Sequence, residues 1–137
     1  MARIICIDYG GKRCGLAVTD PLQIIATALT TVATKDLYTY LASYFANEPV
    51  ELILIGEPLN LDDTPTDATP LVKKAIVELT KKFPTIPIIT VDERFRSKKA
   101  VRAMVEMGMK KKDRRDKKNV DQTAATILLH EYLTHRT

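Results

Sequence analysis

Residues 3–8, Arg-Ile-Ile-Cys-Ile-Asp, and residues 14–19, Cys-Gly-Leu-Ala-Val-Thr, decide the fold. Both are short apolar runs that contain β-branched residues, which is typical of buried strands. A pair of glycines lies between them and supplies a turn, so the two runs should pair as an antiparallel hairpin. Asp20-Pro21 marks a second turn, and a third strand within 25–33 would complete an antiparallel meander.

Beyond residue 35 the pattern changes to alternating helices and strands. Amphipathic spacing and turn residues place helices at 36–47, 68–83, 97–108 and 119–135, and strands at 50–55 and 86–91. Ser97 and Asn119 are the expected N-caps of the last two helices. The order β-β-β-α-β-α-β-α-α predicts an α/β protein with a mixed five-stranded sheet, in which the meander is joined by two parallel strands. Helices should cover both faces of this sheet.

Length and composition indicate one domain, residues 1–137. The chain has 137 residues and 45% hydrophobic side chains, enough for one core but not for two lobes around a cleft. Its longest uncharged stretch, residues 21–34, is too short to span a membrane, and the N-terminus has no signal-peptide pattern. We therefore expect a cytoplasmic protein without a membrane partner, in which Cys6 and Cys14 are buried free thiols.

Acidic residues follow several of the predicted strands. Asp8 ends the first strand, Glu57 follows the fourth, and Asp92-Glu93 follows the fifth. Because the carboxyl ends of parallel strands meet at one edge of a sheet, these acids should converge there. If the last helix packs antiparallel to the fifth strand, Asp121 lies at the same edge.

Converging carboxylates repel one another unless a cation lies between them. Oxygen ligands favour Mg²⁺ or Mn²⁺, and two such ions can support phosphodiester hydrolysis. Each acid also has a simpler explanation, since Asp8 could be a turn residue and Asp121 is favoured by the helix dipole. Asp20 is different, because the second strand runs the opposite way and should place Asp20 at the far edge.

Positive charge is concentrated in one window. Residues 94–118 contain twelve bases and three acids, a net +9, whereas the rest of the chain has nine bases and fourteen acids, a net −5. Together they give the overall charge of +4. The expected phosphate contacts are Lys12, Arg13, Arg94, Arg96, Lys110, Lys111, Lys112, Arg114, Arg115, Lys117 and Lys118. Residues 110–118 should form a mobile loop, and a merely solubilising loop is the alternative. With 6% aromatic residues and no Trp, contacts should follow the nucleic-acid backbone rather than its bases.

Five short motifs occur together over nearly the whole chain. They are Asp8-Tyr9-Gly10-Gly11-Lys12-Arg13, Gly15-Leu16-Ala17-Val18-Thr19-Asp20, Gly56-Glu57-Pro58-Leu59, Asp92-Glu93-Arg94 and Asp121-Gln122-Thr123-Ala124-Ala125. An Asp-x-Gly hairpin alone would also fit the actin and sugar-kinase superfamily, but that fold needs a second large lobe. In combination, the motifs resemble the YqgF/RuvX family. The chain departs from the family pattern at Phe95-Arg96-Ser97, where Leu and a Ser/Thr pair are common, and at Asp62-Asp63, where Asp-Gly is common.

The resemblance implies a ribonuclease H-like fold and a three-carboxylate site for one or two Mg²⁺ or Mn²⁺ ions, here Asp8, Glu93 and Asp121. It implies a nuclease that matures the 5′ end of pre-16S rRNA in ribosome biogenesis, with a Holliday junction resolvase acting on branched DNA as the alternative. A non-catalytic nucleic-acid-binding factor in ribosome assembly or transcription is a third hypothesis. The resolvase would be expected to form a homodimer, whereas an rRNA nuclease could act as a monomer.

Overall fold

The sheet has five strands in the order β3-β2-β1-β4-β5. A computed structural model describes residues 2–57, 69–92 and 117–135, with backbone alone at 92 and 117–121. The strands are β1 Arg3–Asp8, β2 Arg13–Thr19, β3 Ala26–Ala33, β4 Val50–Glu57 and β5 Ile88–Asp92. β1 pairs antiparallel with β2, and β2 with β3, whereas β4 is parallel to both β1 and β5. The predicted meander and the two added parallel strands are thus confirmed.

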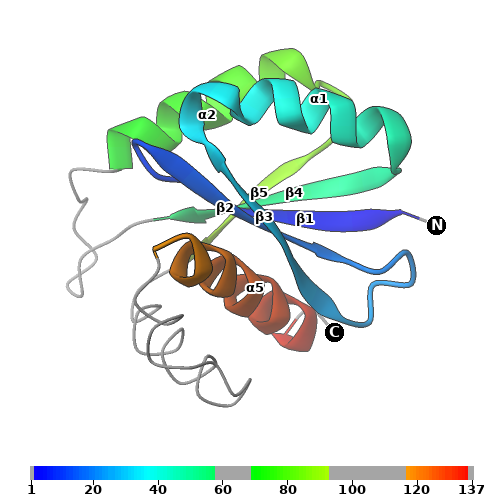
Figure 1. Ribbon diagram of the computed structural model, residues 1–137. Coiled ribbons are helices and arrows are strands. Elements are labelled where there is room, and N and C mark those ends of the chain that lie inside the picture. Colours follow the sequence, from blue (N-terminus) through cyan, green and yellow to red (C-terminus); the bar gives the residue numbers. More distant parts are fainter. Residues whose placement is uncertain (1, 58–68, 93–116, 136–137) are drawn as a thin grey trace.

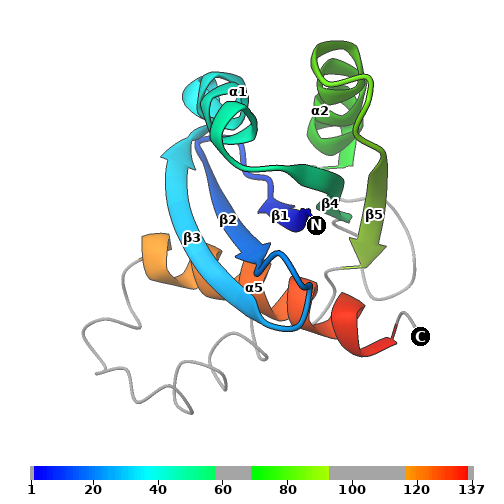
Figure 2. The ribbon, with the colours of Figure 1, turned by 90° about the vertical axis from the view of Figure 1, so that its right-hand side faces the viewer.

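Helices cover both faces of this sheet, as predicted (Figures 1 and 2). One face carries α1, Leu37–Asn47, which follows the short 3₁₀ helix η1, Thr34–Asp36, and also carries α2, Thr69–Lys82. The other face carries α5, Lys117–His135. No helix within the described ranges is both long and apolar enough to cross a membrane.

Strand alternation divides the core into two layers. In β1, Ile5 and Ile7 point toward α1 and α2, while Ile4 and Cys6 point toward α5. The first layer is Ile5, Ile7, Cys14, Leu16, Val18, Leu37, Leu41, Ile53, Ile55, Val72, Ala75 and Leu79. The second layer is Ile4, Cys6, Ala17, Leu54, Ala125, Leu128 and Leu129. A central strand with both faces buried explains the continuous apolar run that opens the chain. Cys6 and Cys14 are buried free thiols, as predicted.

Three predicted boundaries are wrong by two residues. β4 ends at Glu57 rather than at residue 55. The fifth strand begins at Ile88 rather than at residue 86, because the Ile86 N–H donates to the Phe83 carbonyl at 3.1 Å and closes a turn after α2. The Pro87 carbonyl then accepts a hydrogen bond of 3.0 Å from the Ile53 N–H as the chain enters the sheet. The last helix begins at Lys117, so Asn119 lies inside its first turn and is not the N-cap.

Lysine favours helix more than asparagine does, which accounts for the earlier start of α5. Lys117 and Lys118 are consequently helical and do not belong to a loop. The remaining residues of the predicted 110–118 loop, and the helix expected at 97–108, lie outside the described residues.

Candidate active site

Asp8 is a buried carboxylate at the carboxyl end of β1, and its residue is 4% exposed. It follows Cys6 by two residues, so both side chains belong to the face of β1 that α5 covers. Its backbone pairs with Gly15 in β2, which fixes the end of the strand. Asp8 therefore lies at the sheet edge, between the sheet and the helix layer.

α5 begins at the same edge. Figure 1 shows that it runs opposite to β1, with its first residues near the end of that strand. Ala124 and Ala125 are 2% and 0% exposed, and these small residues let the helix approach the sheet closely. Ala125 belongs to the same core layer as Cys6.

Asp121 lies one helical turn before Ala125, just as Asp8 lies two strand residues after Cys6. Four helical residues advance about 6 Å, and two strand residues advance about 6.7 Å. The step from Ala125 back to Asp121 and the step from Cys6 on to Asp8 both lead from the core layer under α5 toward the carboxyl end of β1. The backbone of α5 thus brings position 121 toward Asp8, while the Asp121 side chain lies outside what the structure describes.

Glu57 is a third acid at this edge. The sequence predicts that it converges with Asp8, although it is not one of the three proposed metal ligands. It ends β4 directly opposite Asp92 of β5 in the strand register. Glu57 is half-buried and lines a cavity of about 170 Å³ together with Thr90 and Lys73. Because α2 supplies most of the cavity wall, Glu57 faces the α2 side of the sheet, opposite to Asp8. Residues two apart in a strand share a face, and Ile55 packs under α1 and α2, so the sequence spacing could have predicted the face of Glu57.

The turn between β1 and β2 is held in a defined position. The Thr34 hydroxyl donates a hydrogen bond of 2.6 Å to the Gly10 carbonyl, and the Thr34 N–H donates one of 3.0 Å to the Lys12 carbonyl. A Cβ at Gly10 would lie 2.5 Å from the Arg13 carbonyl oxygen, so only glycine fits without a backbone shift. The turn presents exposed Lys12 and half-buried Arg13 at the same end of the sheet as Asp8.

Two tyrosines link this turn to α1. The hydroxyls of Tyr9 and Tyr38 share a hydrogen bond. Burial raises the pKa of Tyr9 above its ordinary value, and the nearby Cys14 thiol adds to the increase, whereas the bond from Tyr38 opposes it. Burial also raises the pKa of Tyr38, with further contributions from Tyr9 and Glu78. Both phenols therefore stay protonated at neutral pH and act as hydrogen-bonding groups.

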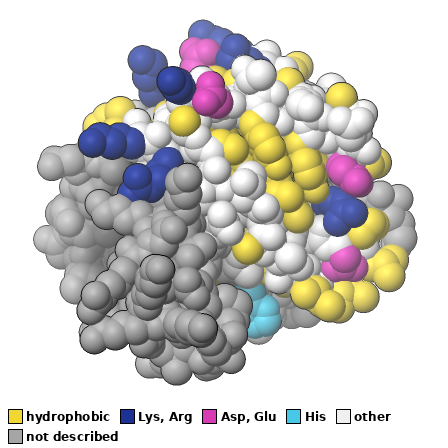
Figure 3. Space-filling model, in the orientation of Figure 1, with side chains coloured by type: hydrophobic (Ala, Val, Ile, Leu, Met, Phe, Trp, Pro, Cys, Tyr) yellow, Lys and Arg dark blue, Asp and Glu magenta, His cyan; other side chains and the backbone are white. Residues whose placement is uncertain are grey.

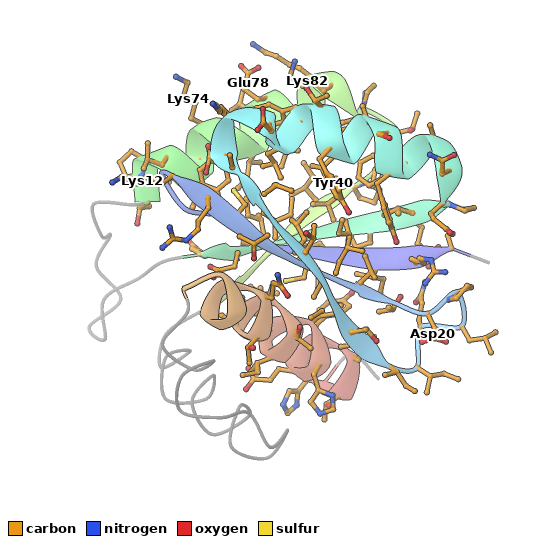
Figure 4. The ribbon with its side chains drawn as sticks, viewed as in Figure 1. Lys12, Asp20, Tyr40, Lys74, Glu78 and Lys82 are labelled. Atoms are coloured by element: carbon orange, nitrogen blue, oxygen red, sulfur yellow. The ribbon has the colours of Figure 1, made fainter. Side chains whose placement is uncertain are left out.

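Asp20 lies at the opposite end of the sheet, as predicted, and Figure 4 shows it on the far side of the molecule from Lys12. Its carboxylate accepts hydrogen bonds from the N–H groups of Leu22 at 3.1 Å, Ile24 at 2.8 Å and Ile25 at 2.8 Å. The bond from Ile25 contributes most to lowering the pKa of Asp20. Asp20 thus shapes the β2–β3 turn, where Gln23 has a φ of 59°.

Several predicted site residues lie outside the described residues. They are Glu93, Arg94, Arg96, Lys110, Lys111, Lys112, Arg114 and Arg115. The side chains of Asp121, Lys117 and Lys118 are likewise not described. Within the part of the chain whose side chains are described, no three His, Cys, Asp or Glu residues form a metal-binding group. The donor set that could hold a divalent cation is therefore Asp8 together with acids that the topology brings to its edge.

Comparison with known proteins agrees with this arrangement. A family model described as "RuvX: Holliday junction resolvase" matches residues 2–135. The chain belongs to the RuvX family. It is 52% identical over 133 residues to a protein of Christiangramia forsetii named "Putative pre-16S rRNA nuclease", covering 97% of this chain and 98% of the relative. A Flavobacterium psychrophilum protein of the same name is 46% identical over 136 residues, with 99% of each chain covered.

A solved structure supports the fold of this RuvX-family protein. Thermus thermophilus RuvC, solved in complex with a Holliday junction substrate, superimposes with a TM-score of 0.58. The match covers 99% of this chain and 96% of the other, at 14% sequence identity. Identity this low carries the fold alone, and it agrees with the ribonuclease H-like architecture expected from the sequence.

Proposed function

We propose that this protein is a divalent-metal-dependent endonuclease that cleaves pre-16S rRNA near its 5′ end. The observation that carries the proposal is the burial of Asp8 on the α5 side of the sheet edge, where α5 brings position 121. The names of the relatives supply the substrate class. Asp8, Glu93 and Asp121 are the proposed ligands of one or two Mg²⁺ or Mn²⁺ ions.

The third ligand is inferred from sequence spacing. Val91 packs in the core layer beneath α5, and Glu93 follows it by two residues, which is the spacing of one strand face. The same spacing relates Asp8 to Cys6. A set of three carboxylates matches the oxygen ligands that Mg²⁺ and Mn²⁺ prefer.

The acidic residues of the site would bind the metal ions, and the basic residues would bind the phosphates. When bound, the cations supply Lewis acidity and a water of lowered pKa. Asp8 is fixed by strand pairing and burial, so it can hold its ligand geometry without rearranging during the reaction. Lys12, in the β1–β2 turn that Thr34 holds, and Arg13, the first residue of β2, would bind the phosphates next to the scissile bond. Arg94, Arg96 and the bases of 110–118 are proposed as further phosphate contacts.

Resolution of four-way DNA junctions is the second candidate. The family description favours it, but the relatives that cover the whole chain carry the rRNA name. Both activities need the same carboxylates and the same phosphate contacts. They differ in substrate and in the number of active sites that must act together.

A parallel cleavage assay separates these hypotheses. The purified protein is incubated with a precursor 16S rRNA fragment and with a four-way DNA junction, each with Mn²⁺ and with chelator. We expect specific cleavage of the rRNA precursor only with metal, and weaker or no cleavage of the junction. Preferential junction cleavage would favour the resolvase. Metal-independent cleavage, or binding without cleavage under any metal, would contradict the proposal.

A further inference from the structure

A row of lysines lies outside the basic window identified in the sequence. α2 carries Lys73, Lys74, Lys81 and Lys82 against a single acid, Glu78. All four lysines are exposed, and within the described part of the chain none forms an ion pair. At 3.6 residues per turn the four lysines fall within one half of the helix circumference, and Glu78 lies in the same half.

This row continues to the β1–β2 turn. A Cβ at Gly11 would lie 3.8 Å from the Leu71 side chain, so the turn lies against the first part of α2. Figure 4 shows Lys12, Lys74, Glu78 and Lys82 in succession from the turn along α2, so one acid lies within the row. In Figure 3, basic side chains gather over this part of the surface, with acidic side chains among them.

A hollow of about 430 Å³ lies beside the end of this row, between α1 and α2. Tyr38, Thr39 and Ala42 of α1 line one wall, and Lys82 and Phe83 line the other. The Lys82 ammonium lies 5.4 Å from the centre of the Tyr38 ring, so a cation and an aromatic ring face the same hollow. Phe83 is held in place by an edge contact with Phe45, with ring centres 4.9 Å apart.

The hollow is connected to the candidate active site. Tyr38, in its wall, shares a hydrogen bond with Tyr9, and Tyr9 follows Asp8 directly in the chain. Lys12 comes three residues after Tyr9 on the same turn. A polynucleotide held near Asp8 by Lys12 could therefore pass the β1–β2 turn and continue along α2 to the hollow.

We propose that the groove between α1 and α2 binds a single-stranded segment of the nucleic-acid substrate, with its phosphates on the α2 lysines and a base in the hollow beside Tyr38 and Phe83. Four lysines and one acid give α2 a net charge of +3, which favours a polyanion, and the aromatic wall favours an unstacked base. A duplex would meet the lysines but could not insert a base. The inference rests on the proposed function only in taking this strand to be part of the substrate.

The test is binding in chelator, so that cleavage plays no part. Fluorescence anisotropy measures the Kd of a labelled 12-nucleotide oligouridine, an oligodeoxythymidine of equal length and an RNA duplex, at several salt concentrations. The double variant Lys81→Ala/Lys82→Ala should bind both single strands about tenfold more weakly. The slope of the logarithm of the binding constant against the logarithm of the salt concentration, the salt slope, should be reduced by about 1.4 in magnitude. The two single-stranded arms show whether ribose or deoxyribose is preferred.

A second variant tests the hollow without changing charge. Ala42 is exposed and lines the hollow, so Ala42→Leu should obstruct it and weaken single-strand binding about fivefold or more at an unchanged salt slope. Ala46→Leu, also exposed on α1 but not lining the hollow, is the matched control and should bind like the wild type. Leu22→Glu/Ile24→Glu lowers the net charge by two at the far end of the sheet, at side chains that are 56% and 67% exposed, and controls for overall charge.

The outcomes separate this inference from the proposed function. Wild-type affinity in both groove variants, an equal loss in both controls, or no single-strand binding by the wild type would overturn the docking proposal, whatever the cleavage assay shows. A groove-dependent Kd in a protein that cleaves nothing would support the docking proposal and contradict the nuclease.

Discussion

Asp8 and Asp20 each follow an apolar strand of the same meander and each precede a turn, yet the two carboxylates lie in different surroundings. Asp20 uses its oxygens to accept hydrogen bonds from three backbone N–H groups of its own turn. Asp8 is buried between the sheet and α5, while its turn is held instead by Thr34. A turn aspartate and a candidate ligand thus look alike in sequence, and the layer that covers them distinguishes them.

Of the changes considered, replacing Asp8 and Asp20 by asparagine should give the largest difference in cleavage rate between the two ends of the sheet. Asp8→Asn removes a charged metal ligand, so we expect the rate of cleavage to fall by about 10³-fold with little change in chelator-measured RNA affinity. Asp20→Asn should leave the cleavage rate within about twofold, because Asp20 lies at the opposite end of the sheet. Single-turnover kinetics measures both rates, and equal losses in the two variants would break the comparison.

The close approach of α5 should be the next most sensitive feature. Ala125 is fully buried against the sheet, so Ala125→Leu overpacks the layer that sets the position of α5 over Asp8. We expect a loss of about 1–3 kcal/mol in the free energy of unfolding, measured with urea, together with a lower cleavage rate. His130→Leu, at an exposed position of the same helix, is the control. A lower stability with an unchanged cleavage rate would show that α5 does not position the site.

The two glycines of the β1–β2 turn should differ from each other. Gly10→Ala places a Cβ 2.5 Å from the Arg13 carbonyl oxygen, and we expect it to cost about 1–2 kcal/mol and to shift Lys12 and Arg13. Gly11→Ala meets only the Leu71 side chain at 3.8 Å, so its melting temperature should stay near that of the wild type. Calorimetry measures both. Equal effects would show that the turn is not fixed by the close approach at Gly10.

The smallest expected effect is a pH dependence at the Asp20 end. The backbone N–H of Ile25 and its neighbours lower the pKa of Asp20 in the folded state. The resulting stability is present above the unfolded pKa, about 3.9, and is lost as the pH falls through the lower folded value. Urea unfolding at acidic pH should therefore show a shallower pH dependence in Asp20→Asn than in the wild type. Identical profiles would contradict the role of this turn.

Much of the fold follows from local sequence patterns. The alternation in residues 3–8 and the glycines after them predict the hairpin, and the apolar run of β4 predicts a strand buried on both faces. The start of β5 could not be predicted, because a hydrogen bond between Ile86 and Phe83 determines where the turn ends. The start of α5 was missed because Asn119 looks like a cap, although helix-favouring lysines precede it.

The candidate site was less predictable than the fold. Strand ends alone place Asp8 at the correct edge, but the face of Glu57 depends on alternation along β4 and on the cavity beneath α2. The lysines of α2 were overlooked because the acids elsewhere in the chain offset their charge in the sequence total. Their importance depends on the fold, which brings the β1–β2 turn with Lys12 against the first part of α2.

Titration of Mn²⁺ by calorimetry into the wild type, Asp8→Asn and Asp20→Asn tests the central claim most directly. The account predicts that the wild type and Asp20→Asn bind Mn²⁺ with the same affinity, and that Asp8→Asn binds it at least about tenfold more weakly. Equal Mn²⁺ binding by Asp8→Asn and the wild type would contradict the assignment of the buried aspartate as a metal ligand.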